Sequence, residues 1–147
     1  SGRHQADQNM NRLTKNGQRL VAFGAINAFL AVALGAFGAH GLQDILTPNA
    51  LQTWHTGVDY HGFHALGLIL VGQLATTTNQ VTRAGWWLLA GITLFSGSLY
   101  LLALSGIKPL GIVTPFGGLC FLIGWFLLAR ALLKQSDHTQ EQPEKSL

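Results

Sequence analysis

The side chains best suited to chemistry in this sequence lie within one stretch of 25 residues, from 40 to 64. The stretch contains four of the six histidines, two of the six acidic residues and a tyrosine: His40, Asp44, His55, Asp59, Tyr60, His61 and His64. On a helix, residues three or four positions apart share one face, which pairs His55 with Asp59. The same spacing brings His64 next to both Tyr60 and His61, so these neighbours could share a proton or an ion.

Three kinds of site are consistent with this cluster. Imidazole and carboxylate groups bind zinc, copper or iron, so a metal or haem site is one interpretation, with His40, His61 and His64 as its candidate ligands. The spacing matches neither a His-Glu-x-x-His motif nor a cysteine site, and the loop that holds His40 would have to fold back. A second interpretation is an ion or proton site, since ionisable groups in membrane spans are usually functional. The third is a structural network, in which the histidines and Asp59 bind water, loop backbone and a helix N-terminus.

The composition indicates that lipid surrounds most of the chain. Asp, Glu, Lys and Arg make up only 10% of the 147 residues, whereas soluble domains average about 25%. Between residues 8 and 136 the only acidic side chains are Asp44 and Asp59. The pI near 9.4 could point to nucleic acid, but the basic residues flank apolar stretches and form no patch with exposed aromatics. We therefore expect the lipid bilayer as a partner, and no nucleic acid.

Four stretches are long enough to cross a bilayer, whose hydrocarbon core needs about 20 apolar residues in a helix. They cover residues 20–39, 57–75, 86–105 and 110–133. The second stretch is the most polar, because a carboxylate and two histidines lie in its first two turns, but its apolar neighbours favour a span over a buried helix of a soluble protein. The predicted fold is an all-α membrane protein, with a four-helix transmembrane bundle over residues 20–134.

Lysine and arginine predict the orientation, since they are enriched at the cytoplasmic ends of spans. With four spans and a cytoplasmic N-terminus, eight basic residues lie on the inner side: Arg3, Arg12, Lys15, Arg19, Arg83, Arg130, Lys134 and Lys145. Only Lys108 then lies outside. We therefore expect both termini in the cytoplasm.

The two ends of the chain are expected to lie outside the bundle. Residues 1–19 form a basic cytoplasmic segment, in which residues 1–9 precede the only methionine, Met10, and begin like a cloning remnant, Ser-Gly-Arg-His. We expect the native chain to begin at Met10. Residues 135–147 hold mostly charged and polar side chains with a proline, so this segment is expected to be a disordered cytoplasmic tail.

Small residues mark one face of the first predicted span. Helices in lipid associate by close backbone approach and interhelical hydrogen bonds, because lipid tails are as apolar as leucine. One sector of this helix holds six small residues, which we call the small-residue face: Gly24, Ala28, Ala31, Gly35, Gly38 and Ala39. Asn27 borders it, and an unsatisfied amide is costly in hydrocarbon. We expect Asn27 to hydrogen-bond to Ser96, Ser98 or Tyr100 of the third span; a substrate path along the glycines is the alternative to simple packing.

Four ordered motifs give the chain a resemblance to a known family. They are GAFGAHGL at 35–42, WHTGVDYHGFHAL at 54–66, FSGSLY at 95–100, and TPFGG at 114–118 followed by GW at 124–125. Over about residues 20–130 the chain resembles the family named domain of unknown function 423, which is itself similar to a small eukaryotic transmembrane protein. The resemblance implies a bacterial inner-membrane protein with four helices and no assigned reaction, cofactor or ligand. It also implies that His40, Tyr60, His61 and His64 occupy motif positions.

The sequence leaves two functions open. No nucleophile is paired with a base and an orienting acid, and the glycines of the first span follow no strand, so no phosphate-binding loop is present. Cys120 has no partner for a disulfide. We therefore expect a noncatalytic membrane protein that acts through helix packing with itself, as a homo-oligomer, or with another membrane protein. The alternative is binding or transport of an ion, a proton, a metal or haem by the polar cluster, which is expected on the outer side.

Overall fold

The computed structural model describes residues 1–75 and 78–140, and these residues form helices and short connections without a strand. The elements in chain order are α1 (Gly2–His40), α2 (Pro48–Leu74), α3 (Asn79–Gly91), η1 (Ile92–Ser96), α4 (Gly97–Ser105), η2 (Lys108–Ile112) and α5 (Thr114–Gln140). The predicted all-helical fold class is confirmed for this part of the chain.

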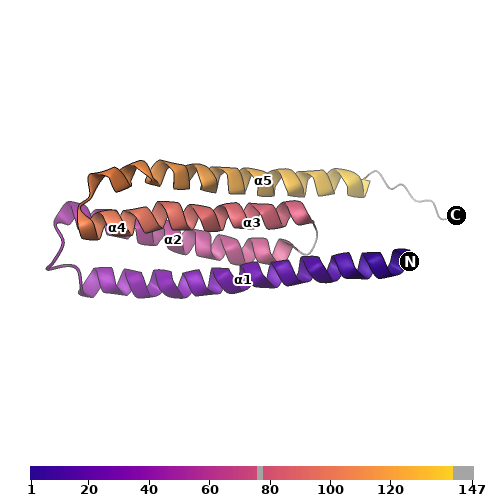
Figure 1. Ribbon diagram of the computed structural model, residues 1–147, viewed down its shortest axis with the longest axis horizontal. Coiled ribbons are helices and arrows are strands. Elements are labelled where there is room, and N and C mark those ends of the chain that lie inside the picture. The colour runs from indigo at the N-terminus through magenta and orange to yellow at the C-terminus, as the bar shows by residue number, and fades with distance from the viewer. Residues whose placement is uncertain (76–77, 141–147) are drawn as a thin grey trace.

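Four antiparallel helical rods make up the bundle: α1, α2, the continuous run of α3, η1 and α4, and α5 (Figure 1). The third rod is continuous from α3 through η1 into α4, and η1 is one turn of π-helix. Such turns insert an extra residue into a helix and occur frequently at functional sites. The start of α1 and the end of α5 lie at the same end of the bundle, as expected for an even number of antiparallel rods (Figure 1).

Local signals explain where the helices begin and end. The Thr47 side chain accepts a hydrogen bond from the backbone N–H of Ala50, and Pro48 occupies the first helical position, where its missing N–H has no role. Because of this start signal, α2 begins nine residues before the apolar stretch predicted at 57–75. At the same end of the bundle α4 stops at Gly106, whose positive φ of 68° suits glycine.

The end of the chain differs from the sequence prediction. Residues 135–140 were expected to be disordered, but they continue α5 as helix. No proline interrupts this segment before Pro143, and the Thr139 hydroxyl donates a hydrogen bond to the carbonyl of Gln135 within the helix. The remaining residues of the predicted tail, 141–147, lie outside the described part. The basic N-terminal segment is likewise helical, from Gly2 onward.

Three rods are long and apolar enough to cross a membrane by length and composition: Gly2–His40, Asn79–Ser105 and Lys108–Gln140. The remaining rod, α2, carries the polar cluster and does not reach that apolar content. It packs mainly against α1 and against the continuous rod formed by α3, η1 and α4. The polar rod therefore lies against two of the three apolar ones.

Close backbone contacts hold α1 against α2. A Cβ added to Gly24 would lie 2.9 Å from the carbonyl oxygen of Ala65, and one added to Gly72 would lie 2.7 Å from that of Gly17. Only glycine permits such an approach. A main core cluster around Leu68 and Leu88 fills the half of the bundle near the termini, and a smaller cluster around Trp54 fills the opposite half.

Candidate functional site

His61 is the centre of a closed hydrogen-bond network between three helices. It lies on α2, is only 4% exposed, and contacts Asn27 of α1 and Tyr100 of α4. The distance from His61 Nε2 to Asn27 Oδ1 is 2.9 Å, and that from Nδ1 to the Tyr100 hydroxyl is also 2.9 Å. Asn27 uses its Nδ2 to donate to the carbonyl of Phe23, so its oxygen faces His61. A neutral His61 then donates from Nε2 to Asn27 and accepts from Tyr100 at Nδ1.

This network corrects the partner expected for Asn27. Asn27 bonds directly to His61, and it reaches Tyr100 only through the imidazole. Ser96 instead donates to the carbonyl of Gly57 at 2.8 Å. Ser98 lies 2.6 Å from the hydroxyl of Thr114 and also bonds to its own helix. The sequence could not separate these partners, because all of these polar groups were candidates and only the helix rotations decide which of them meet.

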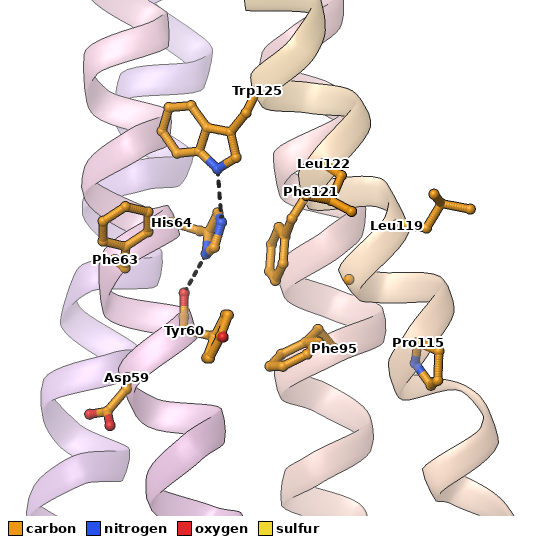
Figure 2. A pocket seen from close by; sticks show the side chains of 11 residues that line it. Asp59, Tyr60, Phe63, His64, Phe95, Pro115, Leu119, Phe121, Leu122 and Trp125 are labelled. Atoms are coloured by element: carbon orange, nitrogen blue, oxygen red, sulfur yellow. Dashed lines mark hydrogen bonds between the residues drawn. The ribbon is translucent and has the colours of Figure 1, made fainter.

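His64 makes a second, separate set of contacts, with its own helix and with α5 (Figure 2). Its Nδ1 lies 2.8 Å from the carbonyl of Tyr60, and Trp125 of α5 donates its indole N–H to Nε2 at 3.1 Å. Because indole only donates, the neutral ring donates from Nδ1 and accepts at Nε2, which is the opposite tautomer to His61. The ring also stacks on Phe121, with centroids 3.5 Å apart. Both nitrogens of His64 are therefore in use.

Of the other members of the predicted cluster, Tyr60 joins the His64 contacts through its backbone carbonyl, and the rest do not join these networks. His40 and Asp44 are exposed at the end of α1 and in the following connection, and His55 lies beside Gly38. His61 and His64 face different neighbours, so the structure does not bring His40, His61 and His64 together. In the part of the chain that the structure describes, no three His, Cys, Asp or Glu side chains are grouped so that they could hold a metal ion.

The small-residue face of α1 packs against α2. A Cβ added to Gly38 would lie 2.6 Å from the ring of Trp54, and Gly35 lies against Val58. Ala31 is buried opposite Gly62, and Gly24 touches the α2 backbone. The remaining members, Ala28 and Ala39, are half-buried. Trp54 is 2% exposed and donates to the carbonyl of Leu34 at 2.9 Å. Sequence reasoning missed this tryptophan, since nothing along the chain indicates that it fits over Gly38.

A groove of about 1010 Å³ opens between α2 and α5, and η1 contributes to its lining. Its lining is mostly aromatic and aliphatic: Asp59, Tyr60, Phe63, His64, Phe95, Pro115, Gly118, Leu119, Phe121, Leu122 and Trp125. Figure 2 shows Asp59 and Pro115 at one end and Trp125 at the other. Eight of the eleven lining residues belong to the cluster or motifs found in the sequence, but the groove itself arises from helices that are far apart in the chain.

Asp59 is the one carboxylate in the lining of this groove. Its side chain is exposed, and within the described residues it takes part in no hydrogen bond or ion pair. The neighbouring Val58 contacts Gly35, five residues before the end of α1 at His40. At a rise of about 1.5 Å per residue, Asp59 therefore lies about 8 Å inside that end of the bundle.

The apolar rods and the buried polar networks define a helical membrane protein, and the comparisons with known proteins agree. Residues 34–118, more than half of the chain, match the family described as Protein of unknown function (DUF423). The chain belongs to this family, as its motifs indicated.

The relatives of the chain are described as membrane proteins. It is 53% identical over 117 residues to the UPF0382 membrane protein YwdK of Bacillus subtilis, which covers 78% of this chain and 95% of the relative. It is 48% identical over 115 residues to a UPF0382 membrane protein of Staphylococcus epidermidis, with coverages of 78% and 94%. No solved structure matches. The family is one of unknown function, so the site has to be interpreted from its own geometry.

Proposed function

We propose that this chain is a noncatalytic four-span protein of the inner membrane, with both termini in the cytoplasm, that binds a partner or ligand within the bilayer. The groove between α2 and α5 is the binding surface in this proposal. The observation that carries it is the exposed Asp59 carboxylate, which lies at one end of a mostly apolar groove and makes no hydrogen bond or ion pair among the described residues. Ionisable groups at such depth are costly and are usually retained for function.

Two features support four crossings. The α2 helix has 27 residues, or about 40 Å of length, which is enough to cross a hydrocarbon core of about 30 Å. Its buried polar side chains, His61 and His64, face other helices and are hydrogen-bonded, so they need not meet lipid. Low apolar content in α2 is therefore compatible with a span.

The charge distribution supports the orientation. Arg12, Lys15 and Arg19 precede the apolar part of α1, Arg83 lies near the start of α3, and the pair Arg130 and Lys134 lies near the end of α5. These positions belong to the end of the bundle at which α1 begins and α5 ends (Figure 1). Lys108 lies at the opposite end. An excess of basic residues at one end of a bundle is typical of the cytoplasmic side.

The surface that was expected to associate with a partner is already covered within the chain. The small-residue face motivated helix packing with a second copy or another membrane protein, but α2 of the same chain occupies that face. Association with a partner would therefore use another surface, and the α2–α5 groove offers one that is lined mostly by apolar side chains. Ion or proton passage through the polar cluster has less support, since Asn27 and Tyr100 occupy both nitrogens of His61.

Cysteine labelling tests the topology. In a Cys120→Ala background, Gln43→Cys and Ile107→Cys should react with a membrane-impermeant maleimide added outside intact cells. Gln80→Cys and Ser136→Cys should react only after permeabilisation. Labelling of Gln80→Cys from outside would show that α2 does not cross, and the reverse pattern at all four positions would show that the orientation is wrong.

Photo-crosslinking in native membranes tests the binding function. A photoreactive amino acid at Leu119 or Leu122, in the groove, should yield an adduct of defined mass. The same amino acid at Val32, which is 74% exposed on α1, is the matched control and should yield only bulk lipid adducts. Identical bulk lipid products at all three positions would overturn the proposed function.

A further inference from the structure

We propose that the groove between α2 and α5 binds an amphiphilic organic cation, with the Asp59 carboxylate as its counter-ion and the aromatic walls around its apolar body. The inference rests on the proposed function, because it names the ligand class of the same groove. The juxtaposition that carries it is one unpaired carboxylate at the end of an otherwise apolar lining.

Charge selects a cation. The lining contains one carboxylate and no Lys or Arg. Its one buried histidine, His64, has both nitrogens engaged by Trp125 and by the carbonyl of Tyr60, so it offers no free hydrogen-bonding atom. A carboxylate in a medium of low dielectric is stabilised by an opposite charge far more than it would be in water. An anionic ligand would meet repulsion from the same group.

The aromatic walls favour an organic cation over an inorganic one. Tyr60 is 45% exposed and Phe63 is 64% exposed, and both lie on α2 within five residues of Asp59. Ring faces attract ammonium groups within about 6 Å, and quaternary ammonium ligands are recognised by such aromatic surfaces. Calcium or magnesium ions require several oxygen ligands, whereas the groove offers a single carboxylate. A metal ion is therefore a poorer match than a soft organic cation.

The shape of the groove fits an amphiphile. Its volume of about 1010 Å³ lies near the upper end of ligand pockets, about 300–1,000 Å³. From Pro115 to Trp125 the α5 wall spans ten residue-to-residue steps, or about 15 Å. Asp59 lies at the end of the groove nearer the α1 terminus at His40, and the apolar walls continue toward the centre of the bundle (Figure 2). A ligand would therefore place its charge toward that end and its apolar body inward.

The wall of the groove is preorganised. His64 is held from both sides by hydrogen bonds and stacks on Phe121, and Phe95 of the π-helical turn contacts both Tyr60 and Phe121. A Cβ added to Gly117 would collide with the backbone of Phe95, so α5 approaches this turn closely. Groups that are already fixed lose little freedom on binding, which favours affinity.

A second copy of the chain is a weaker candidate for the occupant. Residues 20–82, 84–107 and 109–129 contain no Lys or Arg. The one basic residue on that side, Lys108, lies in the connection between α4 and α5 at the end of the bundle. Another copy would therefore have no basic side chain at the depth of Asp59. Dimerisation through the groove is an outcome that the test below distinguishes.

Two ions of matched shape and opposite charge provide the test. The purified full chain in phosphatidylcholine nanodiscs is dialysed against tetraphenylphosphonium or tetraphenylborate, with empty discs as the baseline. We expect saturable binding of the cation above baseline, and at least about tenfold weaker binding of the borate. Equal saturable binding of both ions, or binding of neither, would overturn the inference, as would a dimer that excludes the cation.

Three variants locate the binding. Asp59→Asn should weaken cation binding by at least about tenfold and abolish the preference for the cation, while Asp44→Asn, an exposed acid outside the groove, should leave both unchanged. Leu119→Trp should block binding by filling the groove with Asp59 intact, which covers the case that Asp59→Asn misfolds. If neither Asp59→Asn nor Leu119→Trp changes binding, the inference fails.

The outcome also separates the inference from the proposed function. A defined crosslink at Leu119 without any preference for the cation would leave the binding function standing and remove the cation. Failure of both the crosslink and the dialysis would remove both.

Discussion

The polar groups on two sides of the same helix, α2, differ in burial and in whether they have hydrogen-bond partners. On one side His61 is buried, and each of its nitrogens has a partner on a different helix. On the other side, two residues earlier, Asp59 is exposed in a groove and has no hydrogen bond or ion pair among the described residues. Both groups belong to one motif, WHTGVDYHGFHAL.

The contrast separates structure from binding. A polar group whose hydrogen bonds are all satisfied inside the bundle adds to stability, since breaking it leaves buried partners unpaired. A charged group that is left without partners in an apolar surrounding gives no such benefit. Substitutions on the His61 side should therefore change the free energy of unfolding, whereas substitutions on the Asp59 side should change ligand binding only.

The largest expected effect comes from Trp54, on the His61 side. Trp54→Ala removes a buried ring that packs over Gly38 and Tyr100 and donates to Leu34. The free energy of unfolding should fall by about 3–5 kcal/mol, measured by SDS titration in mixed micelles. Phe63→Ala, an exposed aromatic of the groove, is the control and should cost less than about 1 kcal/mol. Equal losses would contradict the division between the two sides.

The next effect tests the His61 network directly. His61→Leu leaves the Asn27 oxygen and the Tyr100 hydroxyl without their shared partner, so unfolding should become easier by about 1–3 kcal/mol. Asp59→Asn, two residues away on the groove side, should leave the unfolding midpoint unchanged. A stability loss in Asp59→Asn as large as that in His61→Leu would show that the carboxylate is structural.

A smaller effect should follow from Tyr100→Phe, which removes only the hydroxyl that donates to His61. Hydrogen bonds between membrane helices contribute about 0.6 kcal/mol on average and about 1.7 kcal/mol at most. In a double-mutant cycle with His61→Leu, the coupling energy should fall within this range. Additive effects would mean that the two side chains do not interact in the membrane.

The smallest effect is expected at Ser96, which is fully buried and donates to the carbonyl of Gly57. That carbonyl lies within the α2 helix, so Ser96→Ala should cost only about 0.6 kcal/mol. Ser105→Ala, at an exposed serine that bonds within its own helix, is the control and should be neutral. A loss above that of His61→Leu would show that the π-helical turn, and not the imidazole, holds α2 in place.

The helical rods were predictable because they depend on composition and local signals. Too few charges for a soluble surface indicated lipid, and the apolar stretches at 20–39, 86–105 and 110–133 lie within the three rods that qualify as spans. The start of α2 was placed too late, because apolar content was used and the cap at Thr47 and Pro48 was not. The end of α5 was placed too early, because the polar composition of residues 135–140 was taken to indicate disorder. A polar segment without proline can instead extend a helix, here to Gln140.

The candidate site was predictable only as a set of residues. His61, His64 and Asp59 were singled out together because they are adjacent in sequence and suited to chemistry. Their separation into two networks and a groove depends on which helix lies at each face of α2. Trp125 and Phe95 lie 31 or more residues after His64 in the sequence. No spacing along the chain therefore indicates that they line the same site.

The sequence by itself determined that lipid surrounds most of this protein and that its chain is helical. Charge content, apolar length and helix caps are local properties. It also determined the family, because the family motifs can be recognised in the sequence without knowledge of the fold. Only the tertiary structure decided that His61 is satisfied and Asp59 is not. Hydrogen bonds and grooves between helices depend on helix rotation and depth, and close backbone contacts at glycines such as Gly24 and Gly117 set both.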